Sequence, residues 1–367
     1  MLGSGLVLLP AALYAADSSR WIQPEADTVI AEWSVDSLKP AAADDSSSPS
    51  VRADASQPTS LDETFRLAAQ PGGSWRFDSI ALHLSSSSAN DPAYASQPKS
   101  YYEARLLQHQ HRFDDAADKL NALTTADTLA FINVRLLLAQ IRYQQGNTEA
   151  AESLCRSLTL HWSAGLVATC LASVSNHYNP SLVRLMEQTE PATHTQQLRL
   201  WINSQIARQY ALGGEHRLAW EALESERRES GLEVMTVPDV VLWGQLAADF
   251  LNPTERLTLL TPLGQGRYTD DAILLLLGQA SQDCDQRCPS RLRADWLEQL
   301  DERMTLRAQR NDLSYAGVLA EYFLTIDQQP GTALYWAEQH AALNHDPQAR
   351  SLLQRARTQA SNSGGNS

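Results

Sequence analysis

The sequence predicts an all-α protein built from antiparallel helical hairpins, and three observations predict it. Apolar residues recur at helical spacing from about Tyr101 to Arg357. Strand-like alternation is almost absent from that stretch, and three of its segments match one another at regular separations. Because one hairpin cannot bury its apolar face alone, we expect neighbouring hairpins to stack and share one continuous core.

Composition and charge limit the classes of function. The chain has 367 residues, of which 43% are hydrophobic, and this is enough to bury a sizeable core. Its 43 acidic residues outnumber its 29 basic ones, for a net charge of -14. Such a balance provides no general attraction for phosphate backbones or anionic lipid, so we expect no nucleic-acid partner.

The first residues predict the cellular location of the protein. The stretch from Leu6 to Ala16, LVLLPAALYAA, is apolar and has the length of a signal peptide, well short of a membrane-spanning helix. We therefore expect a signal peptide over residues 1–16 and a periplasmic or secreted protein of a Gram-negative-type envelope. The alternative is an uncleaved anchor or a disordered apolar N-terminus. No later apolar run exceeds Ala272–Leu277, so we expect no stable membrane insertion after cleavage.

The rest of the chain divides by composition. Residues 17–63 are rich in Ala, Ser, Asp and Pro and are expected to form a mostly disordered leader. Residues 64–100 are expected to be an irregular or helical lead-in, and 101–357 a helical repeat domain. Within that domain Asn179-Pro180 and Asn252-Pro253 mark helix starts, because Pro suits the first turn of a helix. Residues 358–367 are polar and Gly/Ser-rich and are expected to be disordered.

The repeat is defined by small residues at fixed positions. The segments HRFDDAADKL, GNTEAAESLC and GEHRLAWEAL align with separations of 35 and 68 residues, and 68 is twice 34. Each carries an alanine where two antiparallel helices must approach closely, and a second alanine lies twelve residues earlier. In sequence order the pairs are Ala104 with Ala116, Ala139 with Ala151, and Ala207 with Ala219.

Residues from about Tyr101 to Ala356 resemble tetratricopeptide-repeat (TPR) proteins, whose helix-turn-helix units span 34 residues. More narrowly, the chain is similar to exported bacterial TPR proteins of unassigned activity. The similarity lies in FDDAADKL, in GNTEAAESLC followed by LVATCLASV, in LWGQLAADFL and in the closing GTALYWAEQHAALNHDPQARSLLQRA. The unit between Ala151 and Ala219 departs from the pattern, with Leu185 in place of alanine. The resemblance implies a TPR-like α-solenoid with a right-handed superhelix and a concave inner wall.

The inner wall is the candidate binding surface. The repeat register places polar and aromatic residues of the first helix of each unit on it, and such groups suit the recognition of a peptide or protein. The alternative is that they are ordinary solvated residues or pack between repeats. The predicted partner-binding residues are Tyr101, Arg105, Gln108, His109, Asn133, Gln140, Tyr143, Gln144, Trp201, Ser204 and Arg208.

Four cysteines suggest two disulfide bonds. Cys155 and Cys170 fall on adjacent helices, and a bridge between them would close a loop of about 15 residues, worth about 3 kcal/mol. Cys284 and Cys288 lie four residues apart at a helix start, where a local bridge is plausible. An oxidising compartment would favour both bonds. The alternatives are reduced thiols that only pack or, for the local pair, a metal or redox site, for which the sequence offers a poor ligand set.

These observations favour a binding protein over an enzyme. The sequence has no HExxH, G-x-S-x-G, P-loop or G-x-G-x-x-G motif, and the acidic pairs occur where helices begin and the helix dipole accounts for them. We expect a non-catalytic adaptor that binds a protein or peptide in the concave wall, without a cofactor or metal. The alternatives are a helical enzyme or enzyme subunit with a closed pocket, and a purely structural assembly component.

Overall fold

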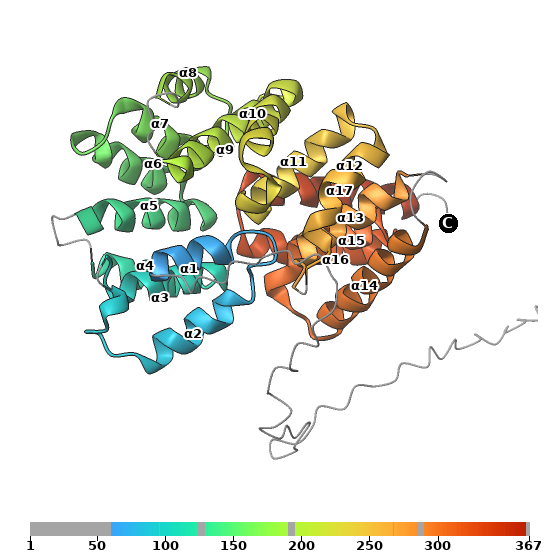
Figure 1. Ribbon diagram of the computed structural model, residues 1–367, viewed down its shortest axis with the longest axis horizontal. Coiled ribbons are helices and arrows are strands. Elements are labelled where there is room, and N and C mark those ends of the chain that lie inside the picture. The colour runs from blue at the N-terminus through green and yellow to red at the C-terminus, as the bar shows by residue number, and fades with distance from the viewer. Residues whose placement is uncertain are drawn as a thin grey trace, which may run out of the picture. The chain divides into compact units, whose positions relative to one another are not determined.

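The computed structural model describes residues 60–94, 96–123, 129–189, 195–266, 268–284 and 290–364. Over these ranges the regular structure is helical, with short 3-10 turns and no strand (Figure 1). None of the described helices is long and apolar enough to cross a membrane. The α-helices are α1 Leu61–Ala68, α2 Arg76–Ser86, α3 Lys99–His109, α4 Phe113–Asn121, α5 Leu129–Gln144, α6 Thr148–Arg156, α7 Ala164–Ser173, α8 Pro180–Thr189, α9 Gln196–Leu212, α10 His216–Ser230, α11 Val237–Phe250, α12 Pro253–Gly264, α13 Asp271–Gln282, α14 Ser290–Gln309, α15 Ala316–Thr325, α16 Pro330–Leu343 and α17 Pro347–Gly364.

Consecutive helices pair as hairpins. From α1/α2 to α15/α16, each odd-numbered helix packs against the even-numbered helix that follows it, and α17 packs on α16 and α15. The first helices of successive hairpins also touch, as in α7 with α9, α11 with α13 and α15 with α17. Figure 1 shows this side-by-side pairing for α3 with α4 and for α5 with α6. The predicted all-α solenoid of antiparallel hairpins is confirmed.

The alanines that define the repeat lie where the helices come closest. All six are at most 1% exposed, because a larger side chain at these positions would push the paired helices apart (Ala104, Ala116, Ala139, Ala151, Ala207 and Ala219). The degenerate unit behaves differently. Leu185, which the register puts at the small position, is 37% exposed, while Val183 and Met186 of α8 are buried instead. The sequence register therefore slips in this hairpin.

Local signals explain where several helices begin. α8 starts at Pro180 and α12 at Pro253, as predicted. At α12 the side chain of Asn252 accepts a hydrogen bond from the Glu255 N–H at 3.0 Å, and the Glu255 carboxylate accepts from the Asn252 N–H at 3.3 Å. This reciprocal capping satisfies two backbone donors that the first turn of a helix leaves without partners.

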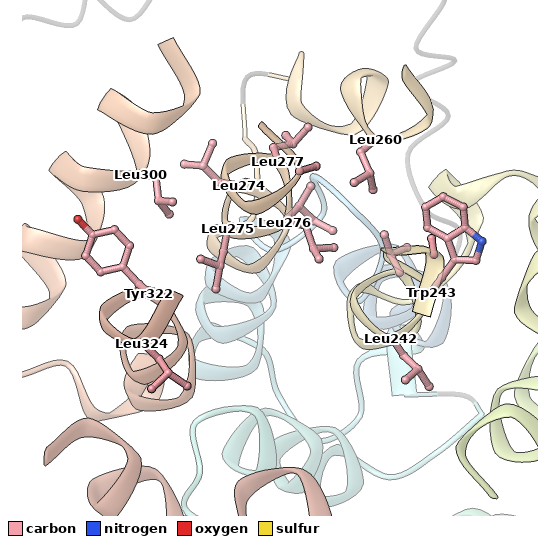
Figure 2. Close-up of a cluster of buried hydrophobic side chains, with 14 of the residues drawn as sticks. Leu242, Trp243, Leu260, Leu274, Leu275, Leu276, Leu277, Leu300, Tyr322 and Leu324 are labelled. Atoms are coloured by element: carbon pink, nitrogen blue, oxygen red, sulfur yellow. The ribbon is translucent and has the colours of Figure 1, made fainter. Parts of the chain in front are cut away.

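The largest apolar core is centred on α11 and α13 (Figure 2). Four successive leucines, residues 274–277, are each at most 6% exposed, although they point in different directions around α13. Their burial follows from packing, because α11, α12, α14 and α15 all contact α13. A helix that is apolar on every side is stable only when neighbours surround it. Trp243 of α11, fully buried, lies in the same core.

Both ends of the described chain hold more helix than the sequence indicates. Residues 64–100, expected as a lead-in, contain most of α1 and all of α2, and Phe65 and Ile80 belong to a core shared with Tyr102 of α3. At the other end α17 continues to Gly364, where a disordered tail was expected from residue 358. The predicted signal peptide, residues 17–59 of the predicted leader and residues 365–367 lie outside the described residues.

Turns that are far apart in the sequence also touch. The backbone N–H of Gly72, between α1 and α2, donates to the Asp270 carboxylate at 2.6 Å. The N–H of His345, between α16 and α17, donates to the Gln144 carbonyl at the end of α5 at 3.2 Å. Late hairpins are therefore in direct contact with early ones. A solenoid with contacts only between neighbouring repeats does not describe this chain.

Candidate functional site

A pocket of about 360 Å³ opens between α1, α3 and α5. Five of the eleven predicted partner-binding residues line it, so the structure brings these five side chains together on one surface. The remaining lining consists of two leucines and one acidic residue from α1. The lining residues are Asp62, Tyr101, Arg105, Gln108, Asn133, Leu136, Leu137 and Gln140.

Helix α5 provides one side of the pocket through a single face. Asn133, Leu136, Leu137 and Gln140 are spaced by three, four and seven residues, which places them on one stripe of the helix. Val134 is buried in the core on another face. Among the described residues, the amides of Asn133 and Gln140 have no hydrogen-bond partner, so each offers a free donor and a free acceptor.

Helix α3 also contributes residues to the pocket lining. The Arg105 guanidinium lies over the Phe65 ring, 4.2 Å from its centroid, and 5.9 Å from that of Tyr101. This stacking holds the long side chain in one orientation. Burial raises the pKa of the Tyr101 hydroxyl, so the phenol stays neutral at physiological pH. Gln108 donates from its amide to the Gln144 side-chain oxygen at 2.8 Å, and this bond joins α3 to the end of α5.

Asp62 of α1 lines the pocket but is not among the predicted residues, because the composition of residues 17–63 predicts a disordered leader there. Its carboxylate accepts hydrogen bonds from the hydroxyls of Ser96 at 2.7 Å and Tyr102 at 3.1 Å, and lies 3.4 Å from the Arg105 guanidinium. A local signal was available. The sequence Ser60-Leu-Asp-Glu63 has the spacing of a helix N-terminus, and the Ser60 hydroxyl accepts from the Glu63 N–H at 3.2 Å.

Three further predicted residues lie near the pocket and bind other parts of the chain. Gln144 is engaged by Gln108 as described. His109 stacks on Phe77 of α2 with ring centroids 3.5 Å apart. Tyr143 is buried and donates from its hydroxyl to the Ser175 carbonyl at 3.4 Å. The side chains of His109 and Tyr143 therefore join neighbouring helices and are not part of the pocket lining.

The predicted residues of the later unit do not join this pocket. Trp201 packs against Trp162, with ring centroids 6.1 Å apart. Ser204 and Arg208 of α9 both donate to the Asp239 carboxylate, at 2.6 and 3.0 Å. These three side chains thus hold α9 against its neighbours, which is the packing role that the sequence left open as an alternative.

The two cysteine pairs differ in what the structure describes. The sulfurs of Cys155 and Cys170 are 2.00 Å apart and their Cα atoms 5.6 Å apart, with both residues buried at the junction of two hairpins. Cys284, just after α13, is 2% exposed, and its predicted partner Cys288 lies outside the described residues. Within the described ranges, no three His, Cys, Asp or Glu residues are grouped to hold a metal ion.

Comparison with known proteins finds similar chains among solved structures. No family model matches the sequence, and neither does any curated protein. Among solved structures, the chain is similar to the C-terminal part of a TPR repeat-containing protein from Cytophaga hutchinsonii, with 15% identity, 69% of this chain and 99% of that chain covered, and a TM-score of 0.35. It is also similar to the P58(IPK) TPR domain, with 10% identity, 83% and 98% covered, and a TM-score of 0.22.

Proposed function

We propose that this protein is a non-catalytic adaptor that binds a segment of another protein in the pocket between α1, α3 and α5. The proposal rests on the lining of the pocket. It combines two amides without hydrogen-bond partners, a guanidinium held in one orientation and two leucines. Amides can pair with the main chain of a bound segment, and the leucines can bury one of its apolar side chains. The helical hairpins hold these groups in place before binding, which lowers the entropic cost of association.

We also propose that the protein acts in the cell envelope. The apolar stretch from Leu6 to Ala16 supports export. The adjacent sulfurs of Cys155 and Cys170 support an oxidising compartment, since disulfides persist there and are rare in the cytosol. Cell fractionation tests this, and recovery of the full-length protein with Met1 and free thiols in the cytosolic fraction would refute it.

Site-specific photo-crosslinking in intact cells tests the binding site. A photo-reactive amino acid at Gln140 should crosslink one or a few discrete proteins, because this side chain lines the pocket. The matched control is Arg217 on α10, whose side chain is 79% exposed and lies on a different hairpin. Asn133→Ala in the same chain should weaken the crosslink from position 140. Equal crosslinking from positions 140 and 217 would contradict the proposal.

A further inference from the structure

We infer that Asp62 sets the specificity of the pocket, so that it selects an extended peptide segment without acidic side chains. This inference rests on the proposed function, because it assigns a class of ligand to the same pocket. It is carried by the charges, spacing and hydrogen bonding of the eight residues that line the pocket.

The two charged side chains of the pocket have opposite signs and lie next to each other. Of the eight described lining residues, Asp62 and Arg105 carry charge, and their closest atoms are 3.4 Å apart. The Arg105 guanidinium would otherwise be the natural partner for a carboxylate of a ligand. With Asp62 beside it, an incoming carboxylate meets a like charge as well as the guanidinium. Specificity commonly uses such a repulsive element alongside the attractive ones.

Asp62 is held in this position by bonds that do not depend on Arg105. The hydroxyls of Ser96 and Tyr102 both donate to one oxygen of the carboxylate, and the other oxygen faces Arg105. Its side chain remains 43% exposed, so the charge acts at the surface of the pocket rather than inside the core. The carboxylate is therefore placed where a ligand would encounter it.

The free amides define the length of the bound segment. Asn133 and Gln140 are seven residues apart on one face of α5, and this corresponds to about 10 Å along the helix axis. An extended chain rises about 3.3 Å per residue, so the two amides span about three residues of it. Each amide offers one donor group and one acceptor, which matches the N–H and C=O of a peptide main chain.

The two leucines between the amides determine which side chain fits the middle of the bound segment. Leu136 and Leu137 lie between Asn133 and Gln140 on the same stripe, and both line the pocket. An aliphatic side chain in the middle of the segment would contact them. The ligand class is thus an extended stretch of three or four residues with a central aliphatic side chain and no acidic group.

Selection from a displayed library of random heptapeptides on the full-length protein tests this class. We expect the wild-type chain to select peptides with a central Leu, Ile or Val and few Asp or Glu residues. From the selected consensus, a fluorescent peptide and its variant with Asp beside the aliphatic residue are then compared by anisotropy. The acidic peptide should bind about twofold to fivefold more weakly, the range for a partly exposed charge contact.

Two variants assign the effect to Asp62. Asp62→Asn should remove the penalty, so that the acidic peptide binds as well as or better than the neutral one, because Arg105 is then free to pair with it. Since Asp62→Asn could also loosen the contact with Ser96 and Tyr102, Arg105→Gln provides a second measurement. It keeps Asp62 and should increase the penalty on the acidic peptide, which a simple loosening of α1 would not do.

The outcomes separate this inference from the proposed function. Selection of acidic peptides by the wild-type chain, or the same charge preference in wild type and Asp62→Asn, would overturn the role of Asp62 while leaving peptide binding intact. Selected peptides whose affinity does not fall in Asn133→Ala would show that they bind elsewhere, and this would overturn both. Failure to enrich any peptide would likewise overturn both.

Discussion

The hydrogen bond between Trp243 and Glu224 should contribute measurably to the stability of the α10/α11 region. The Trp243 indole N–H donates to the Glu224 carboxylate at 3.0 Å, and both side chains are buried. Trp243→Phe removes the donor, and the smaller ring leaves a small void. Arg227 and Arg228 still hydrogen-bond the carboxylate, so Glu224 does not become an unpaired buried charge.

These contacts give the expected magnitude. A hydrogen bond to a charged group contributes about 1.5–3 kcal/mol, and the low end applies here because Glu224 keeps its two arginines. The void lowers the stability by about a further 1 kcal/mol. We therefore expect Trp243→Phe to destabilise the α10/α11 region by about 2–3 kcal/mol. The matched control is Trp336→Phe, because Trp336 is also buried but has no hydrogen bond from its indole among the described residues. Trp336→Phe should lower the stability by about 1 kcal/mol, which is the contribution of the void alone.

Hydrogen exchange is the suitable assay, because it reports the stability of α10 and α11 separately from that of the rest of the chain. We expect amides of α10 and α11 to exchange faster in Trp243→Phe at pH 7. Burial alone would raise the pKa of Glu224, but hydrogen bonds from Arg227, Trp243 and Arg228 hold it below its ordinary value of 4.5. The stabilisation is therefore present above pH 4.5 and lost as the pH falls through the lowered pKa.

A double-mutant cycle with Glu224→Met, which removes the acceptor, isolates this bond. The coupling free energy between positions 243 and 224 should be about 1–2 kcal/mol at pH 7, in line with the bond to a charged acceptor. A coupling near zero, or equal costs for Trp243→Phe and Trp336→Phe, would refute the reasoning.

Two other predictions follow from buried or paired groups. Cys155→Ser with Cys170→Ser should lower the unfolding free energy by about 3 kcal/mol, the loop-entropy value for 15 residues, and a reductant should change thermal unfolding more in the wild type than in the variant, which keeps Cys284 and Cys288. Burial lowers the pKa of His111 and His340, and burial together with neighbouring His111 lowers that of His109 to about 4. The folded protein thus keeps these rings neutral while the unfolded chain binds protons, so stability should be full above pH 6.5 and fall progressively from pH 6.5 towards 4. Thermal unfolding measured across this pH range gives the dependence of stability on pH, which should be weaker in His340→Asn. An unchanged dependence in this variant would contradict the role given to His340.

The repeat could be predicted from sequence because it depends on local and periodic features. Apolar spacing identifies helix faces, and closely approaching helices require small residues, so the alanines at 116 and 151 are informative without any structure. The departure at Leu185 shows the limit of this reasoning. Once the period weakens, a shift of one residue decides which side chain of α8 is buried, and spacing alone cannot resolve it.

The pocket could be predicted only in part. Periodicity shows which face of a helix carries Asn133 and Gln140, but it does not show what packs against a face. For that reason the repeat register predicts a binding role for Arg208, whereas in the structure Arg208 pairs with Asp239, 31 residues later. Composition predicts a leader around Asp62, and the contact of Asp62 with Arg105, 43 residues away, leaves no local sequence pattern. Such contacts are set by tertiary packing rather than by local pattern.

The contact between the turn that follows α16 and the third hairpin, α5/α6, changes how this chain should unfold. In a simple repeat array, an end can fray without affecting distant units, since each repeat senses only its neighbours. Here the turn at His345 is bonded to Gln144, and Gly72 is bonded to Asp270, 198 positions along the chain. Fraying of α17 therefore removes support from α5 as well. We therefore expect these distant hairpins to be thermodynamically linked, and the described hairpins to unfold more cooperatively than a row of independent units.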